Sequence, residues 1–359
     1  MSTDRNWENE AIRKLEADFN RSADTHLFGI DIPGVPGIDI YIKDESIHPT
    51  GSLKHRLARS LFLYGLCNGW IADQTTIIES SSGNTAVSEA YFARLLGLPF
   101  IAVVPKSTSH QKVEQIQFYG GKVHFVDRAT DVYDVSRQLA QETGGYYMDQ
   151  FTFAEKVTDW RGNNNIAESI FKQMTKEPHP VPEWIVCSAG TGGTSATLGR
   201  YARYLRSNTK ICVADPENSV FYDYYHSGDR NLTQDKGSRV EGIGRPRVEP
   251  SFIPDVIDRM IRVPDAASFA TIHVLEELVG RRFGGSTGTN MFATLQIAET
   301  MRQTNQVGSV VTLACDPGDR YADTYFNKQW LTDNGHDIEP YRAKLMQFIE
   351  GGYWEFDAP

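Results

Sequence analysis

The sequence has few cysteines, no block of basic residues and no long apolar run. Its 359 residues include four cysteines, Cys67, Cys187, Cys212 and Cys315. They are widely separated, form no CxxC pair and have no histidines at metal-ligand spacing, so we expect reduced core thiols and no metal site. The net charge is −10, which makes nucleic acid or an anionic membrane an unexpected partner. No run reaches membrane-spanning length and the start MSTDRNWENE is polar, so we expect a cytoplasmic protein without a signal peptide.

The length and the hydrophobic pattern predict a two-lobed α/β protein. About two domains are expected for a chain of this size. Short apolar runs alternate with helical patterns, which is typical of parallel sheets flanked by helices. Strands are expected at 38–44, 75–80, 99–105, 122–127, 184–189, 210–215 and 309–316. We predict a smaller lobe at 45–155, a larger lobe formed by 1–44 plus 156–345, and a C-terminal tail at 346–359.

Lys54 lies near the start of an expected helix, after the corner HPTGS in HPTGSLKHR (48–56). The first turn of a helix carries partial positive charge, so it disfavours an ammonium group. Lys54 is therefore either an ordinary solvated lysine or an amine with a chemical role.

A glycine-rich corner follows the expected strand at 184–189. In CSAGTGGTSATLGRY (187–201) the residues between strand and helix are Gly190, Thr191, Gly192, Gly193 and Thr194. Glycines allow close backbone approach, and the helix dipole favours an anion, so this corner suits a phosphate. A tight turn without a ligand is one alternative. A nicotinamide-dependent dehydrogenase is another, because Gly190-x-Gly192-x-x-Ser195 nearly matches GxGxxG and Asp215 ends the next strand, although serine replaces the third glycine.

Two further corners carry hydroxyl and amide groups before a helix. In ESSSGNTAVSEA (79–90) they are Ser81, Ser82, Gly83, Asn84 and Thr85, and in GGSTGTN (284–290) they are Ser286, Thr287 and Thr289. Such donors can bind a carboxylate. They are also common helix caps, so both interpretations stay open.

A lysine at a helix start, a phosphate loop and a carboxylate loop are what a pyridoxal phosphate enzyme acting on amino acids needs. The motifs HPTGSLKHR, SSSGNTA, AGTGGT, EGIG and GGSTGTN, in this order, resemble the cysteine synthase family of fold type II pyridoxal phosphate enzymes. The similarity covers residues 35–330. The segments KDESIHPTGSLKHRLARSLFLY, DQFTFAEKVTDWRGNNNIAESIF and EGIGRPRVEPSF are more similar to its cysteine desulfhydrase branch.

The resemblance implies pyridoxal 5'-phosphate as cofactor, bound by the larger lobe and joined to Lys54 as a Schiff base. The implied cofactor contacts are Asn84, Gly190, Thr191, Gly192, Gly193, Thr194 and Ser286, and the implied substrate contacts are Ser81, Ser82, Gly83, Thr85, Gln150 and Gly242. The implied reaction is elimination of sulfide from cysteine through an aminoacrylate, giving pyruvate and ammonia. Replacement of acetate in O-acetylserine by sulfide, as in cysteine synthases, and an inactive scaffold remain alternatives. A homodimer is expected.

Two positions depart from the family pattern. The synthases usually carry an acidic residue after the lysine, whereas this chain has His55, which we interpret as a core or solvated histidine rather than a catalytic one. In ACDPGDRY (314–321), Pro317 replaces the serine that contacts the pyridine nitrogen, and proline offers no side-chain hydrogen bond. We hypothesise that Asp316 or Cys315 makes this contact. A plain Asp-Pro-Gly turn is the alternative.

Overall fold

The computed structural model describes residues 5–22 and 24–356. It contains two compact units, Met1–Asp24 with His48–Thr158, and Thr25–Ile47 with Asp159–Pro359. Each unit holds a mostly parallel sheet flanked by helices, which confirms the predicted fold class. The division differs from the expected one, because the described residues before Thr25 belong to the first unit and not to the larger lobe. Within the described residues, no helix has the length and apolar character of a membrane span.

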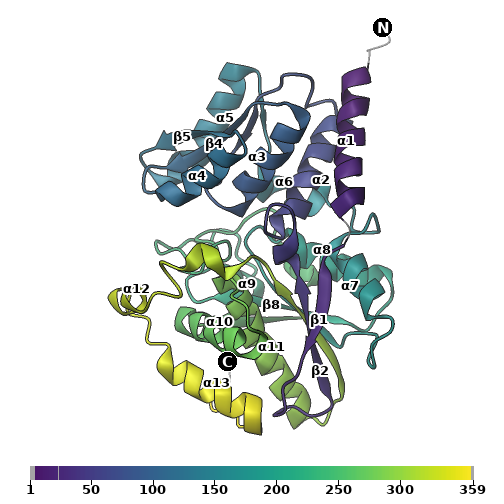
Figure 1. Cartoon of the computed structure of the whole chain (residues 1–359), viewed down its shortest axis with the longest axis vertical. Helices are drawn as coiled ribbons and strands as arrows, with labels where there is room; N and C mark the ends of the chain where they lie inside the picture. The colour runs from purple at the N-terminus through teal and green to yellow at the C-terminus, as the bar shows by residue number, and fades with distance from the viewer. Residues whose placement is uncertain (1–4, 23, 357–359) are drawn as a thin grey trace. The chain divides into compact units, whose positions relative to one another are not determined.

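The first unit is built on a four-stranded parallel sheet with the order β5-β4-β3-β6. Figure 1 labels its strands β4 and β5. Its strands are β3 (Ile77–Glu79), β4 (Phe100–Pro105), β5 (Lys122–Val126) and β6 (Tyr146–Tyr147). Its helices are α1 (Asn6–Ser22), α2 (Lys54–Cys67), α3 (Asn84–Leu96), α4 (His110–Phe118), α5 (Val132–Thr143) and α6 (Gln150–Val157).

Alternation along the strands produces two apolar faces on this sheet, because successive side chains of a strand point to opposite sides. Ile77 packs in a cluster with residues of α1, α2 and α3, whereas Ile78 packs in a second cluster with residues of α5. Ala11 and Leu15 of α1 are buried in the first cluster. This apolar stripe explains why α1 belongs to the first unit.

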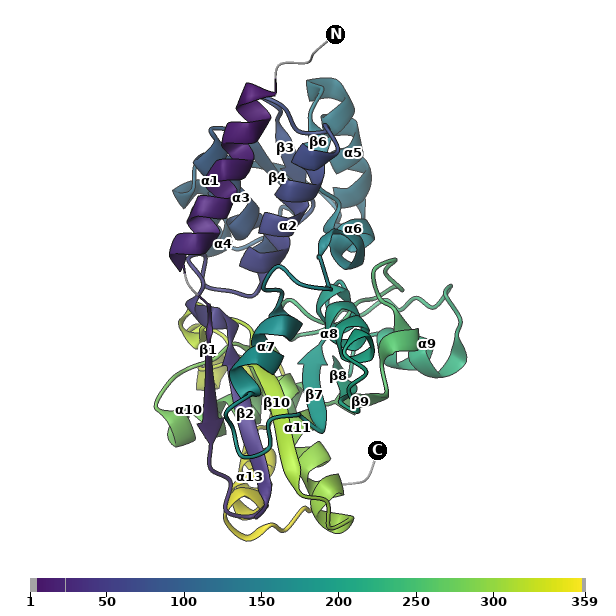
Figure 2. The same ribbon diagram turned by 90° about the vertical axis from the view of Figure 1, so that its right-hand side faces the viewer.

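The second unit contains a six-stranded sheet with the order β1-β2-β10-β7-β8-β9, in which β1 is antiparallel and the other pairs are parallel (Figure 2). Its strands are β1 (His26–Ile30), β2 (Ile38–Asp44), β7 (Trp184–Ser188), β8 (Lys210–Pro216), β9 (Arg259–Val263) and β10 (Gly308–Ala314). Its helices are α7 (Ile166–Met174), α8 (Gly193–Tyr204), α9 (Phe221–Ser227), α10 (Asp265–Val279), α11 (Gly285–Gln303), α12 (Lys328–Asp333) and α13 (Glu339–Gly351).

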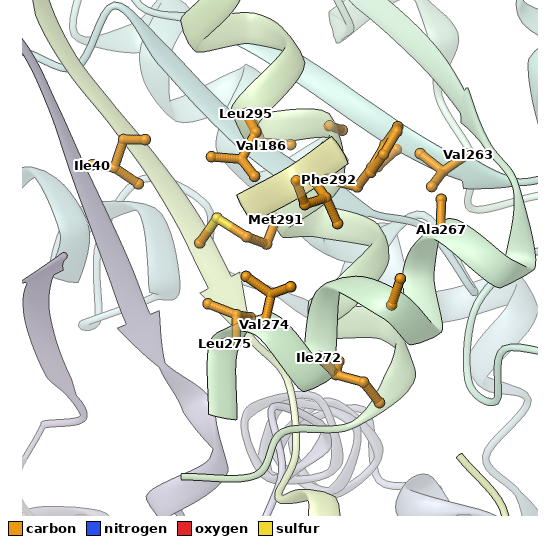
Figure 3. Close-up of a cluster of buried hydrophobic side chains, with 14 of the residues drawn as sticks. Ile40, Val186, Val263, Ala267, Ile272, Val274, Leu275, Met291, Phe292 and Leu295 are labelled. Carbon is orange, nitrogen blue, oxygen red and sulfur yellow. The ribbon is translucent and has the colours of Figure 1, made fainter. Parts of the chain in front are cut away.

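The core of the second unit lies between its sheet and helices α10, α11 and α13 (Figure 3). Met291 and Leu295 of α11 pack there with Val186 of β7 and Ile40 of β2. Helix α13 adds Phe348, so residues 346–351 of the expected tail continue a helix that begins at Glu339. Residues 357–359 of that tail lie outside the described residues.

Candidate active site

Lys54 is the first residue of α2, immediately after a tight turn. Gly51 has a positive φ of 73°, and its N–H donates to the His48 carbonyl over 2.7 Å. The Lys54 N–H donates to Ser52 Oγ over 3.3 Å. The first turn of α2 contains no acidic residue, so within the helix itself no carboxylate compensates the half-buried Lys54 side chain.

His55 points into the first unit, which agrees with its interpretation as a core histidine. Its side chain is buried, and its Nδ1 lies 3.2 Å from Thr50 Oγ1. Its Nε2 lies 4.0 Å from Asp18 Oδ2 on α1, and Asp18 also accepts a hydrogen bond from Tyr91 over 2.7 Å. The polar cluster therefore ties the start of α2 to α1 and α3.

The carboxylate loop joins β3 to α3 in the same unit. Ser81, Ser82, Gly83 and Asn84 are all half-buried, so their polar groups are accessible to a ligand. Gly83 is the N-cap of α3, and no side chain of the loop caps the helix. The Ser81 Oγ accepts from the Gly83 N–H over 3.2 Å, so Ser81 forms a local turn just before the helix and makes no hydrogen bond to the first turn itself.

Gln150 lies against this loop, although 65 residues separate it from Thr85. The Thr85 hydroxyl donates to Gln150 Oε1 over 2.8 Å, and both residues are buried. Asp149, just before it, has a positive φ of 47° and caps α6 by accepting from the Thr152 N–H. The structure thus brings together Thr85 and Gln150, two residues that the sequence assigned to the substrate carboxylate.

The phosphate loop joins β7 to α8 in the second unit. Gly192 is the N-cap of α8 with a φ of 90°, and the first turn of the helix has no acidic residue. A Cβ on Gly190 would lie 2.2 Å from the Gly242 carbonyl oxygen, and one on Gly192 would lie 2.5 Å from Phe252 Cα. Only glycine fits either position. The loop is a cradle of backbone groups at a helix N-terminus, which fits a phosphate group.

Gly242 lies beside this cradle because a backbone hydrogen bond holds its segment there. The Gly244 N–H donates to the Ala189 carbonyl over 2.8 Å. EGIG and AGTGGT, which the sequence treats as separate motifs, therefore lie side by side in one unit.

Asp215 does not suit the ribose-binding role of the dinucleotide alternative. It is fully buried, and its Oδ2 accepts from the Tyr222 N–H over 2.9 Å. Burial raises its pKa from 3.8 to about 7. A ribose hydroxyl could not reach this carboxyl without displacement of α9.

Ser286 and Asp316 share one corner, where β10 ends and α11 begins. The Gly284 N–H donates to the Asp316 carbonyl over 3.0 Å, and a Cβ on Gly284 would lie 2.0 Å from Asp316 Oδ1. Asp316 is buried and accepts a hydrogen bond from Tyr321 over 2.7 Å. Burial, together with the Asp316 charge, holds the Tyr321 pKa well above its usual range, so Tyr321 stays a donor at neutral pH.

Cys315, the other hypothesised pyridine contact, is oriented differently. Its Sγ lies 3.5 Å from Asn290 Nδ2, and its backbone N–H donates to Thr287 Oγ1 over 3.1 Å. Tyr321 was not expected from the sequence, although it lies in ACDPGDRY only five residues after Asp316.

Comparison with known proteins identifies the family. Residues 25–316 match the model of a family described as pyridoxal-phosphate dependent enzymes. The chain belongs to this family. Pyridoxal phosphate is therefore its cofactor, and the dehydrogenase alternative is wrong. The glycine cradle at 190–194 fits the phosphate of that cofactor.

Two curated relatives and one solved structure are similar to this chain over most of its length. It is 56% identical to L-cysteine desulfhydrase Cds1 of Mycobacterium tuberculosis, over 98% of this chain and 97% of that protein. It is 26% identical to cysteine synthase 1 of Emericella nidulans, over 83% and 81% of the two chains. A hydrogen sulfide-producing enzyme from Fusobacterium nucleatum has the same fold, with a TM-score of 0.77, 23% identity and coverage of 88% and 92%.

Proposed function

We propose that the protein is an L-cysteine desulfhydrase, which converts cysteine and water into hydrogen sulfide, pyruvate and ammonia. The observation that carries this proposal is the 56% identity to a curated L-cysteine desulfhydrase along 98% of the chain. The chemistry of the two loops and of Lys54 supports it, because each offers a group that this reaction requires.

Lys54 would hold the cofactor aldehyde through its amine, and the backbone of Gly190–Thr194 would bind the cofactor phosphate. Asn84 and Ser286 are further contacts to the cofactor. When bound, pyridoxal phosphate supplies an electron sink for the electron pair left at the substrate Cα. The Lys54 amine, when it is not bound to the cofactor, would act as the general base that removes the Cα proton, and it is suited to this because an ammonium is not favoured at a helix N-terminus.

The substrate carboxylate binds to the loop of the first unit. Ser81, Ser82, Gly83 and Thr85 supply hydroxyl and amide donors, and the Gln150 side chain completes the set. Gln150 already accepts from Thr85 over 2.8 Å, so its amide NH2 is oriented to donate to a ligand. Gly242 lines the substrate side of the phosphate loop.

Asp316 would contact the pyridine nitrogen in place of the serine that this chain lacks. A carboxylate there favours a protonated ring, which is a stronger electron sink than a neutral one. The hydrogen bond from Tyr321 to Asp316 fixes the orientation of that carboxylate. Pro317 forms an isolated β-bridge with Phe283, so its role is to stabilise the backbone of this corner.

The test combines an absorbance spectrum with product analysis. The purified protein should absorb in the visible range, change its spectrum on addition of cysteine and release sulfide and pyruvate in equal amounts. Lys54→Ala should lose both the visible band and the activity, whereas Lys122→Ala, a change of an exposed lysine in the same unit, should keep both. Faster turnover of O-acetylserine plus sulfide than of cysteine alone would favour a cysteine synthase instead.

We also propose a cytoplasmic homodimer, on the basis of the family resemblance. Reduced thiols support the cytoplasmic location, since the chain has four free cysteines and three of them are buried. Light scattering of the purified protein should give twice the 40.3 kDa mass of one chain, and the mass of a single chain would refute the dimer.

A further inference from the structure

Two carboxyl groups are buried side by side directly beneath the carboxylate loop. Glu79 is the last residue of β3, and Glu89 lies on α3. Both side chains are 0% exposed. Acidic residues are almost never fully buried unless they are paired, so this arrangement requires an explanation.

Glu79 is the residue of the two that receives hydrogen bonds. Its Oε1 accepts from the Ser80 N–H over 2.6 Å and from the Ser80 hydroxyl over 3.1 Å. Its Oε2 accepts from the Gln150 N–H over 3.1 Å. Three donors stabilise the negative charge on Glu79, and they are supplied by the two residues that begin the carboxylate loop and helix α6.

Glu89 has a different environment. Within the described residues, no N–H or O–H group donates to either of its carboxyl oxygens. Its partner is the Glu79 carboxyl. Two carboxyl groups can form a hydrogen bond only if one of them carries a proton, and Glu79 has the donors that favour the charged form. The proton therefore belongs on Glu89.

The surrounding charges agree with this assignment. The Glu89 pKa lies well above its usual range. Burial is the largest cause, and the charge of the adjacent Glu79 is the second. Burial also raises the Glu79 pKa to about 7, with a further increase from Asp149. The other titratable groups that sense the pair are Tyr146 and Tyr147, which are neutral at pH 7. Among the residues that the structure describes, no lysine or arginine takes part in these interactions, so no cation replaces the proton.

We propose that Glu89 is a protonated positioning residue, which donates its proton to Glu79 and thereby holds Ser80 and Gln150 in place for the substrate carboxylate. The role of Glu89 in positioning groups for the substrate carboxylate rests on the proposed function. The proton also matters electrostatically, because a second negative charge beneath the loop would repel the substrate carboxylate.

Two substitutions separate the hydrogen bond from the charge. Glu89→Gln keeps an N–H donor toward Glu79 and removes the titratable group, so the KM for cysteine should stay within about twofold of the native value. Glu89→Leu keeps the volume and removes the donor. Its KM for cysteine should rise about tenfold, which corresponds to one lost hydrogen bond to a charged group. The kcat should change much less, because Lys54 is untouched.

A difference infrared spectrum tests the proton without any measurement of activity. The native protein should absorb more strongly in the carbonyl band of protonated carboxylic acids than Glu89→Gln and Glu89→Leu do, because each variant loses the Glu89 contribution while that of other buried acids such as Asp215 is common to all three proteins. Glu114→Gln, which removes an exposed glutamate of the same unit, should keep the band and the KM.

An undiminished band in Glu89→Gln would overturn the proposal, because the proton would then lie elsewhere. An unchanged KM in Glu89→Leu, or a tenfold rise in Glu89→Gln, would overturn the positioning role. If Glu89→Leu does not fold, the infrared band and the KM of Glu89→Gln still decide. Failure of the native protein to release sulfide would refute the proposed function and leave the infrared result unaffected.

Discussion

Replacement of Gly192 by alanine should weaken cofactor binding more than it weakens the fold. Gly192 has a φ of 90°, and a Cβ there would lie 2.5 Å from Phe252 Cα and 2.7 Å from the Ser251 carbonyl oxygen. The left-handed conformation costs a non-glycine residue about 1–2 kcal/mol. Because both neighbours are backbone atoms, the loop itself has to move.

The displacement should be seen in the affinity for pyridoxal phosphate. Loss of one hydrogen bond from a loop amide to the charged phosphate costs about 1.5–3 kcal/mol, so the Kd should rise about 10- to 150-fold. The affinity is measured by adding pyridoxal phosphate to apoprotein and following the visible absorbance, with the thermal unfolding of each apoprotein recorded in parallel.

Gly280→Ala is the matched control for this substitution. Gly280 lies in the same unit with a φ of 68°, and nothing lies within 4 Å of the position that a Cβ would take there. This variant should lose about 1–2 kcal/mol of stability and keep the native Kd. Equal cofactor affinity in Gly192→Ala and Gly280→Ala would refute the argument that close backbone approach forms the phosphate cradle.

Three other substitutions test separate parts of the structure. Asp316→Asn should keep the cofactor and lower the turnover of cysteine at least about tenfold, and an unchanged spectrum and turnover would exclude Asp316 as the pyridine contact. Burial raises the pKa of Asp215 to about 7, so the folded chain holds a proton that the unfolded chain releases, and the free energy of unfolding falls as pH rises from 4 to 7. In Asp215→Asn the free energy of unfolding should fall less between pH 4 and 7, by up to about 4 kcal/mol. A free energy of unfolding that changes with pH as in the native protein would contradict this. The Phe269 ring is fully buried and stacks on the Tyr325 ring, with 4.5 Å between the ring centroids. Phe269→Ala should lower the free energy of unfolding by about 3–5 kcal/mol. A decrease below about 1 kcal/mol in urea denaturation would disprove tight packing there.

The strands that bury both faces could be predicted from the sequence. β4, β7, β8 and β10 contain short apolar runs, and β2 alternates isoleucine with other residues in IDIYI; the observed bounds of all five differ from the predicted ones by two residues at most. Three strands were missed because they lack this signal. β6 has two residues, β1 lies at a sheet edge, and β9 contains Arg259 and Arg262.

The loops of the candidate site could be predicted because glycine and small polar residues cluster in them. Lys54 and Gly192 were proposed in this way. For Gly192 the structure adds a physical reason, because this residue has a positive φ and lies close to the Phe252 backbone. Glu89 could not be found, since one glutamate in a helix is normally a surface residue. Its burial depends on the packing of α3 against α1, α2 and β4, which a single sequence does not reveal.

The bond between Lys54 and the cofactor is the central claim, and mass spectrometry after borohydride reduction and proteolysis tests it most directly. The peptide containing Lys54, and no other lysine peptide, should carry the added mass of the reduced cofactor. An unmodified Lys54 peptide, with the cofactor on another lysine or absent, would contradict it.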